Sequence, residues 1–196
     1  MEVIMDYFKS EAFEKHRKNI YNKLEQIPYA ESPDGWTFKG NFSIGGLEYF
    51  GFDESSDLLL VVSSNGRGII DLAKAEKITR DYTDNFELDE TLLICEGFDV
   101  LKDKSIKLAG KYGGSILPIS NSFGDCLQKV SPLYPCEDVI YQPAFENCLI
   151  EGHNKNCVRI YRGFLYCFGF SFSGNYFVIA DDSGILFWER NYHLKV

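Results

Sequence analysis

The sequence has no run of apolar residues long enough to cross a membrane as a helix. Such a helix needs about 20 consecutive apolar residues, and the longest apolar runs here are much shorter. The first stretch, MEVIMDYFKSEAFEKHRKN, carries charges throughout, so it does not have the pattern of a secretory signal peptide. These absences predict a soluble, cytoplasmic protein with no membrane partner.

Residue types and spacings that build metal and catalytic sites are also scarce, because the chain has only three histidines. The spacing Cys148-x4-His153-x3-Cys157 lacks the close Cys-x2-Cys pairs of structural zinc sites, so we expect no metal and no other cofactor. No Gly-x-Ser-x-Gly nucleophile motif is present, and GKYGGS (110–115) does not have the spacing of a phosphate-binding loop. No motif therefore predicts an enzyme.

Disulfides are a third expected absence, although the chain has six cysteines. Four of them stand inside short strand-like runs, where a cysteine usually acts as a small buried hydrophobic residue. Since no secretory signal is seen, the sequence predicts free thiols. The four are Cys95, Cys148, Cys157 and Cys167.

What the chain does contain is a repeat. FGFDESSDLLLVVSSNGRGIIDL (50–72) and FGFSFSGNYFVIADDSGILFWER (168–190) align without a gap, 118 positions apart. Each copy reads as strand, turn, strand, turn, strand, which predicts a three-stranded antiparallel meander. Phe50 should be equivalent to Phe168, and Leu60 to Val178; Phe170, Val178 and Trp188 should lie in the core.

Apolar residues at helical spacing predict one amphipathic helix over residues 3–26, before the turn-forming segment ESPDG (31–35). Its expected apolar stripe contains Ile4, Phe8, Ala12, Ile20 and Leu24. Short runs rich in Ile, Val, Leu and Tyr fill the rest of the chain. The predicted fold is one domain over 1–196, mainly β. The helix and a linker occupy 1–30, and antiparallel meanders occupy 36–190 in a propeller-like arrangement or two packed sheets.

The second copy of the repeat resembles part of a WD40 blade, through its Ser-Gly-Asn turn, its Ser-Gly turn and its Trp-acid ending. It differs in two respects: the stretch from Gly184 to Trp188 is one residue short, and no Gly-His pair precedes it. GGLEYFGF (45–52), LLLVVSSNGRGIIDLAKAEKITRD (58–81) and IKLAGKYGGSILP (106–118) are similar to an uncharacterised bacterial family. This resemblance implies a bacterial protein and no particular activity.

The net charge of −9 comes from one part of the chain. Residues 46–100 hold thirteen acids and four bases, whereas the acids and bases of the two flanking parts nearly balance. The acids are densest in RDYTDNFELDE (80–90), among two aromatic residues. Such a surface repels nucleic acid and attracts basic proteins. The residues predicted to bind a basic protein partner are Asp81, Tyr82, Asp84, Phe86, Glu87, Asp89 and Glu90.

Arg67 lies between two glycines in NGRG (65–68), where a guanidinium could contact a bound anion or carboxylate ligand. The simpler interpretation is a tight turn whose arginine pairs with Asp71 or Asp81. Two function classes follow. The favoured one is a non-enzymatic protein-binding module, of the inhibitor or immunity-protein kind that neutralises a basic toxin. The alternative is an enzyme with a polar site around Arg67, Asp71 and Asp181.

Overall fold

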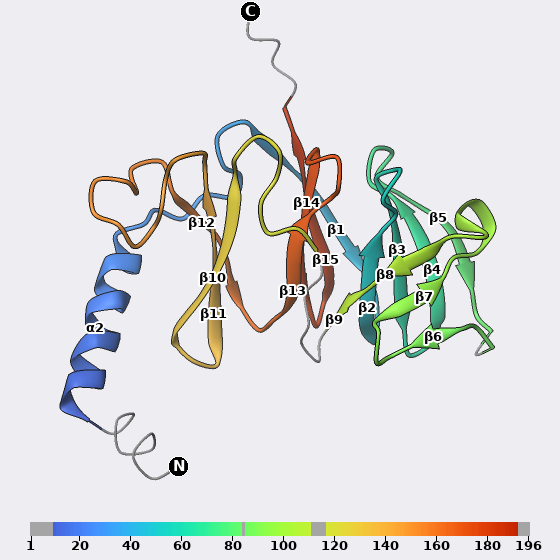
Figure 1. The fold of residues 1–196 in the computed structure, drawn as a ribbon, viewed down its shortest axis with the longest axis horizontal. Coiled ribbons are helices and arrows are strands. Elements are labelled where there is room, and N and C mark those ends of the chain that lie inside the picture. Colours follow the sequence, from blue (N-terminus) through green and yellow to red (C-terminus); the bar gives the residue numbers. More distant parts are fainter. Residues whose placement is uncertain (1–9, 84, 111–116, 192–196) are drawn as a thin grey trace, which may run out of the picture.

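The computed structural model describes residues 10–83, 85–110 and 117–191. Within these ranges the chain is mostly antiparallel β-sheet, with one α-helix, α2 (Glu11–Glu25), near the N-terminus. This confirms the predicted fold class. Figure 1 shows the helix at one end and the larger sheets side by side in a row; the described strands do not close into a ring.

Sheets 1 and 2 follow the helix along this row (Figure 1). Sheet 1 has the order β10-β11-β12, and sheet 2 has the order β1-β15-β14-β13. Sheet 2 therefore joins the first strand of the described chain to the last three. The strands of sheet 1 are β10 (Cys126–Leu133), β11 (Cys136–Gln142) and β12 (Val158–Gly163); those of sheet 2 are β1 (Trp36–Ser43), β13 (Leu165–Phe170), β14 (Tyr176–Asp181) and β15 (Gly184–Arg190).

Sheets 3 and 4 form the other end of the molecule. Sheet 3 has the order β5-β4-β3-β2-β9, so β5 is an edge strand, and sheet 4 has the order β6-β7-β8. The strands of sheet 3 are β2 (Leu47–Phe52), β3 (Leu58–Ser63), β4 (Gly66–Asp71), β5 (Glu76–Asp81) and β9 (Ala109–Gly110); those of sheet 4 are β6 (Leu88–Asp89), β7 (Ile94–Glu96) and β8 (Ser105–Lys107), with a 3-10 turn, η1 (Asp99–Leu101), between β7 and β8.

The predicted repeat is present in the structure. Strands β2, β3 and β4 begin at residues 47, 58 and 66, and β13, β14 and β15 begin at the matching residues 165, 176 and 184. Pairing in both copies is irregular at the same place, between the first and third residues of the first strand. Gly66 and Gly184 start the third strand with positive φ angles of 99° and 138°, which glycine adopts without steric cost. The two stretches therefore form equivalent meanders.

Three apolar layers hold the sheets together. The layer between sheets 1 and 2 contains Phe170 and Trp188, the layer between sheets 2 and 3 contains Phe50 and Val178, and the layer between sheets 3 and 4 contains Leu60. All five are almost fully buried, so the predicted core residues of the second meander are confirmed. Alternate residues of one strand face opposite layers, because strand side chains alternate between faces. Each inner sheet consequently buries apolar side chains on both of its faces.

The helix packs less extensively than its sequence predicted. Ser10 caps it by accepting a hydrogen bond from the Phe13 N–H, and Leu24 is its buried residue. Leu24 and the partly buried Ile20 contact a cluster on sheet 1, whereas Ala12 is exposed. The expected stripe residues Ile4 and Phe8 lie outside the described residues. The helix thus docks by its C-terminal half; no described helix is long and apolar enough to span a bilayer.

One predicted strand is a loop in the structure, whereas the cysteines are free thiols, as predicted. The strand-like run that contains Cys148 is not a strand: residues 147–150 lie in turns of the long connection between β11 and β12. All six cysteines are free. Burial raises the pKa of the Cys148 thiol to about 11 and that of Cys157 to about 12. These two thiols therefore act as small apolar residues of the core.

Candidate functional site

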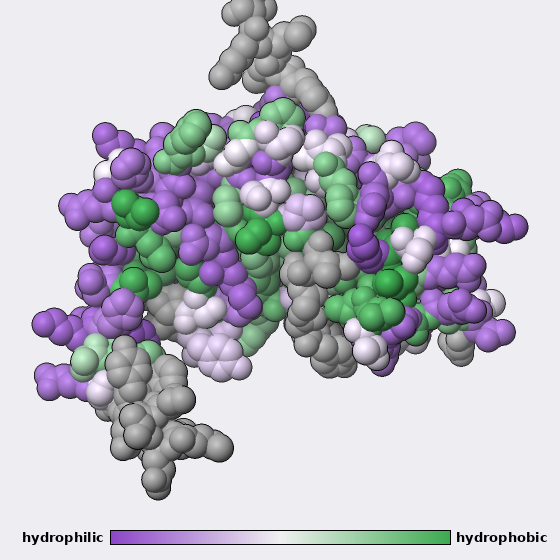
Figure 2. Space-filling model, viewed as in Figure 1, coloured by the Kyte–Doolittle hydropathy of each residue, from purple (hydrophilic) through white to green (hydrophobic). Residues whose placement is uncertain are grey.

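Strand β6 of sheet 4 and the residues beside it carry the second half of the predicted acidic stretch, residues 86–90. Sheet 4 is held against sheet 3 by one apolar face. Cys95 and Ile106 point from this small sheet into the layer that also contains Leu60, Val62 and Ile69 of sheet 3. The other face of the sheet is left to solvent, so its polar side chains gather there. Figure 2 shows an apolar area at this end of the molecule bordered by hydrophilic side chains.

A concave surface with a volume of about 600 Å³ lies on sheet 4, and we call it the acidic hollow. Its apolar lining comes from Phe86, Leu88 and Ile94. Four carboxylates surround these side chains, and none of them forms an ion pair with another described residue. The four are Glu87, Asp89, Glu96 and Asp103.

The cation in the hollow's lining, Lys104, is already engaged. Its ammonium group contacts Asp53 Oδ2 at 2.7 Å and Ser55 Oγ at 2.8 Å, both in the turn between β2 and β3. Burial by itself would raise the pKa of Asp53, but hydrogen bonds from Lys104, Ser56 and Ser55 lower it below its usual range. Lys104 therefore neutralises Asp53 and leaves the four carboxylates of the hollow uncompensated.

This pair gives a pH-dependent prediction. The pKa of Asp53 is lower in the folded protein, so its contribution to stability is present above about pH 4, the ordinary range of an aspartate, and is lost as the pH falls through the folded value. Asp53→Asn should lower the free energy of unfolding at pH 7 by about 1–3 kcal/mol. Urea denaturation at pH 7 and pH 3 should show this difference shrinking in acid. A difference that stays constant between the two pH values would contradict the assignment.

Arg67 connects sheet 4 to sheet 3, and it is nearly buried, with 10% of its side chain exposed. Its Nε donates to Asp81 Oδ2 at 3.0 Å, and its Nη1 donates to the carbonyl of Glu96 at 2.6 Å. The guanidinium also lies over the rings of Phe86 and Phe98, 4.9 and 4.6 Å from their centroids. The arginine thus pairs with a nearby carboxylate, as the simpler sequence interpretation held, and fixes the aromatic residues beside the hollow.

The predicted binding residues divide into groups in the structure. Phe86, Glu87 and Asp89 line the hollow, and Glu90 is exposed at the next position. Asp81 is bound to Arg67; the N–H and hydroxyl of Thr83 and then Arg67 lower its pKa. Tyr82, 76% exposed, lines a different groove beside β5, and Asp84 lies outside the described residues.

Two acids of the hollow, Glu96 and Asp103, were not among the predicted residues. They follow the acidic stretch by 6 and 13 positions, and antiparallel pairing of β7 with β6 and β8 brings them back beside it. The excess of acids over the whole of 46–100 pointed toward Glu96, but nothing local marks either residue as part of a site.

The structure does not bring together the three residues of the enzymatic alternative. Arg67 lies between sheets 3 and 4, and Asp71 binds the N–H and ammonium group of Lys74 at the far end of β4. Asp181 accepts a hydrogen bond from Tyr161 of sheet 1, on the opposite side of sheet 2. Each polar group is engaged with a different neighbour, so no shared site forms among them.

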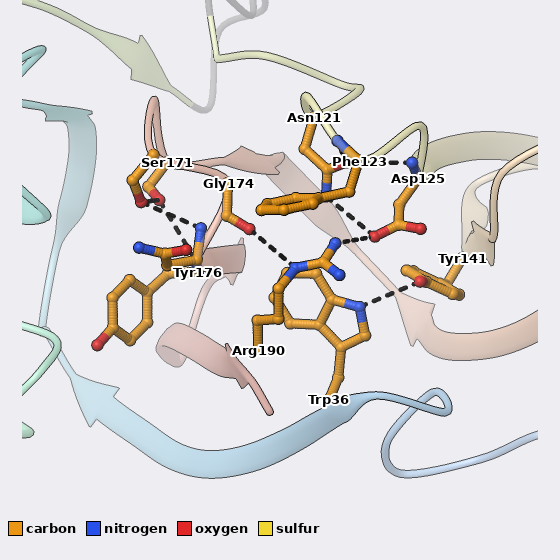
Figure 3. Close-up of polar contacts among 11 residues, drawn as sticks. Trp36, Asn121, Phe123, Asp125, Tyr141, Ser171, Gly174, Tyr176 and Arg190 are labelled. Carbon is orange, nitrogen blue, oxygen red and sulfur yellow. Dashed lines mark hydrogen bonds and ion pairs between the residues drawn. The ribbon is translucent and has the colours of Figure 1, made fainter. Parts of the chain in front are cut away.

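A second polar cluster, which the sequence did not reveal, joins sheet 2 to sheet 1 (Figure 3). The Arg190 guanidinium lies between the rings of Trp36 and Phe123, 4.8 and 3.9 Å from their centroids, and pairs with Asp125. Trp36 Nε1 donates to the Tyr141 hydroxyl at 3.1 Å. The members satisfy one another, so this cluster acts as a structural cross-link.

No family model matches the chain, and no curated protein is found to be related to it. Among the described residues, no group of three or more His, Cys, Asp or Glu side chains is arranged to hold a metal ion. The candidate site is therefore chosen on its charge: the acidic hollow holds four carboxylates that have no ion-pair partner among the described residues.

Proposed function

We propose that this protein is a non-enzymatic binding module whose acidic hollow receives a basic protein partner. The observation that carries the proposal is the set of four carboxylates, Glu87, Asp89, Glu96 and Asp103, around an apolar floor without a compensating cation. A lysine or arginine of the partner would place its aliphatic stem on Phe86 and its charge among the carboxylates. Opposite charge would also steer the partner to this face.

The remaining parts of the proposal concern setting and class. The protein acts in the bacterial cytoplasm, as an inhibitor or immunity protein that neutralises a basic toxin. The acidic surface, the meander scaffold and the absence of a recognisable catalytic motif in the sequence support this class. Its meanders are of a WD40-like kind, arranged in a row that displays loops and edge strands at the end where the hollow lies.

Neutralising the hollow should slow association with the partner. The variant Glu87→Gln, Asp89→Asn, Glu96→Gln, Asp103→Asn removes four charges, and we expect the association rate to fall by about ten- to a thousandfold at low salt. Its remaining salt dependence should be weaker than that of the wild type, since salt screens such charges beyond about 8 Å. The measurement is association kinetics at low and high salt, on the partner captured from the producing cells.

A matched control separates position from total charge. The variant Glu11→Gln, Asp34→Asn, Glu151→Gln, Asp182→Asn changes the net charge equally at exposed sites away from the hollow. It should leave association close to wild type, and both variants should melt near the wild-type temperature, because exposed substitutions cost little stability. An association rate lowered equally by both variants, or by neither, would refute binding at the hollow.

A further inference from the structure

A groove with a volume of about 470 Å³ lies on the other face of sheet 3, and no step of the proposed function uses it. It is bounded by the β1–β2 connection, residues 43–45, on one side and by the edge strand β5 on the other. We call it the β5 groove. Its apolar lining includes Ile44, Val61, Ile70 and Ile78. Its volume lies in the range of about 300–1,000 Å³ that small-molecule sites occupy.

The repeat explains why this groove is open. In the first meander Val61 pairs with Gly68, and the equivalent pair in the second meander is Ile179 with Leu186. The first copy therefore has a bare backbone where the second has a large side chain. A Cβ added at Gly68 would lie 3.3 Å from the Thr79 carbonyl oxygen and 3.4 Å from a Val61 methyl, and the φ angle is not in the glycine-only region. The φ angle thus does not require glycine, although a side chain here would need the Thr79 carbonyl to shift by a few tenths of an ångström and would contact Arg80 Cδ.

The strand that pairs with the third strand of each meander also differs between the two sheets; it is β1 in sheet 2 and β5 in sheet 3. In sheet 2, Phe38 of β1 pairs with Trp188, and their rings pack 5.0 Å apart. In sheet 3 the residue equivalent to Trp188 is Ile70, and it pairs with Lys77 of β5. The position that an aromatic ring fills in sheet 2 is therefore occupied in sheet 3 by the smaller, buried Ile70, with the cation Lys77 beside it on β5.

Two cations line the β5 groove without a carboxylate partner among the described residues. Arg80 Nη2 donates to Ser63 Oγ at 2.7 Å and to the Asn65 carbonyl at 3.2 Å, while Lys77 Nζ donates to the Ser43 carbonyl at 2.8 Å. These neutral acceptors orient the two side chains and leave their charges uncompensated. This is unusual within residues 46–100, where acids outnumber bases thirteen to four.

We infer that the β5 groove binds a small amphipathic carboxylate. Its apolar chain packs over Gly68 against Ile44 and Val61, and its carboxylate pairs with Arg80 and Lys77. Charge-assisted hydrogen bonds to a guanidinium give the head group its specificity. The exposed Tyr82, whose ring lies under the Arg80 guanidinium at 5.4 Å, borders the same groove and shields the head group from solvent.

The probe that tests this inference is decanoate, measured by isothermal titration calorimetry below its micelle concentration. The protein should bind decanoate saturably, while decanol should bind more weakly and decylamine should not bind at this site. Lys77→Gln with Arg80→Gln should weaken decanoate binding about tenfold or more, because each lost charged contact is worth about 1.5–3 kcal/mol. Gly68→Leu, which introduces the residue of the second meander, should abolish binding by filling the groove.

Two controls keep the result specific. Lys129→Gln, a cation of sheet 1, and the four-site hollow variant should both bind decanoate as the wild type does. Circular dichroism and a melting curve will show whether Gly68→Leu is folded, and competition by decanoate for one equivalent of a fluorescent fatty-acid probe gives a second readout. Any of three results would overturn the inference: no saturable binding of decanoate, equal binding of decylamine, or unchanged binding by a folded Gly68→Leu. This holds whatever the outcome for the acidic hollow.

Discussion

Trp188→Ala should lower the free energy of unfolding by about 3–5 kcal/mol, the usual cost of truncating a buried aromatic residue. Trp188 is 2% exposed, and its ring is stacked on Phe177 with centroids 4.6 Å apart. Its Nε1 donates to the carbonyl of Glu31 at 2.7 Å, so it also ties the linker after the helix to sheet 2. The substitution removes packing and leaves that carbonyl without its donor.

Urea denaturation should show this loss as a lower midpoint with an unchanged slope. Trp188→Phe retains a stacked ring and loses the hydrogen bond, so it should cost less than Trp188→Ala. Phe164→Ala supplies the control: that ring is largely exposed, and its removal should stay within about 0.5 kcal/mol of wild type. A wild-type midpoint for Trp188→Ala would show that its ring does not contribute to the core.

Arg67→Met should be the second most damaging substitution, with a cost of about 3 kcal/mol, because it breaks two charge-assisted hydrogen bonds, one of which is a nearly buried ion pair. It removes the Arg67 donors from Asp81 Oδ2 and from the Glu96 carbonyl, while Thr83 still donates to Asp81 Oδ1 and the Cys95 thiol still donates to that carbonyl. It also removes the cation that lies over Phe86 and Phe98. Because methionine keeps most of the side-chain volume of arginine, the lost stability should come mainly from the lost hydrogen bonds and charge, and little of it from lost packing.

The position of Arg67 predicts where the damage appears. Amide hydrogen exchange should quicken across sheet 4, residues 86–107, while sheets 1 and 2 remain protected. Arg17→Met is the matched control, since its exposed pair with Glu14 is worth less than about 1 kcal/mol. Uniform loss of protection over all four sheets would show that Arg67 is not a local connector. If the proposed function is correct, Arg67→Met should also weaken partner binding, because it releases the wall of the acidic hollow.

The sequence by itself determined the two meanders, although their first strands, β2 and β13, begin three residues before the aligned stretches. Strand alternation and glycine turns such as those at Gly66 and Gly184 are local properties, so they can be read at each copy independently. The same holds for the buried residues Phe170 and Trp188, and for the acidic character of 80–90. It also left the choice of partner for Arg67 between Asp71 and Asp81, because both are close in sequence.

Only the tertiary structure decided which distant strands meet. β1 pairs with β15 across most of the chain, and the sheets stack in a row, because apolar faces of separate meanders bury one another and local pattern does not specify the order. Pairing within sheet 4 brought Glu96 and Asp103 to the acidic hollow, and pairing of β4 with β5 in sheet 3 placed Asp81 opposite Arg67. The β5 groove likewise depends on strand pairing, since a glycine at position 68 indicates nothing until Val61 and Arg80, its partners on the adjacent strands, are known.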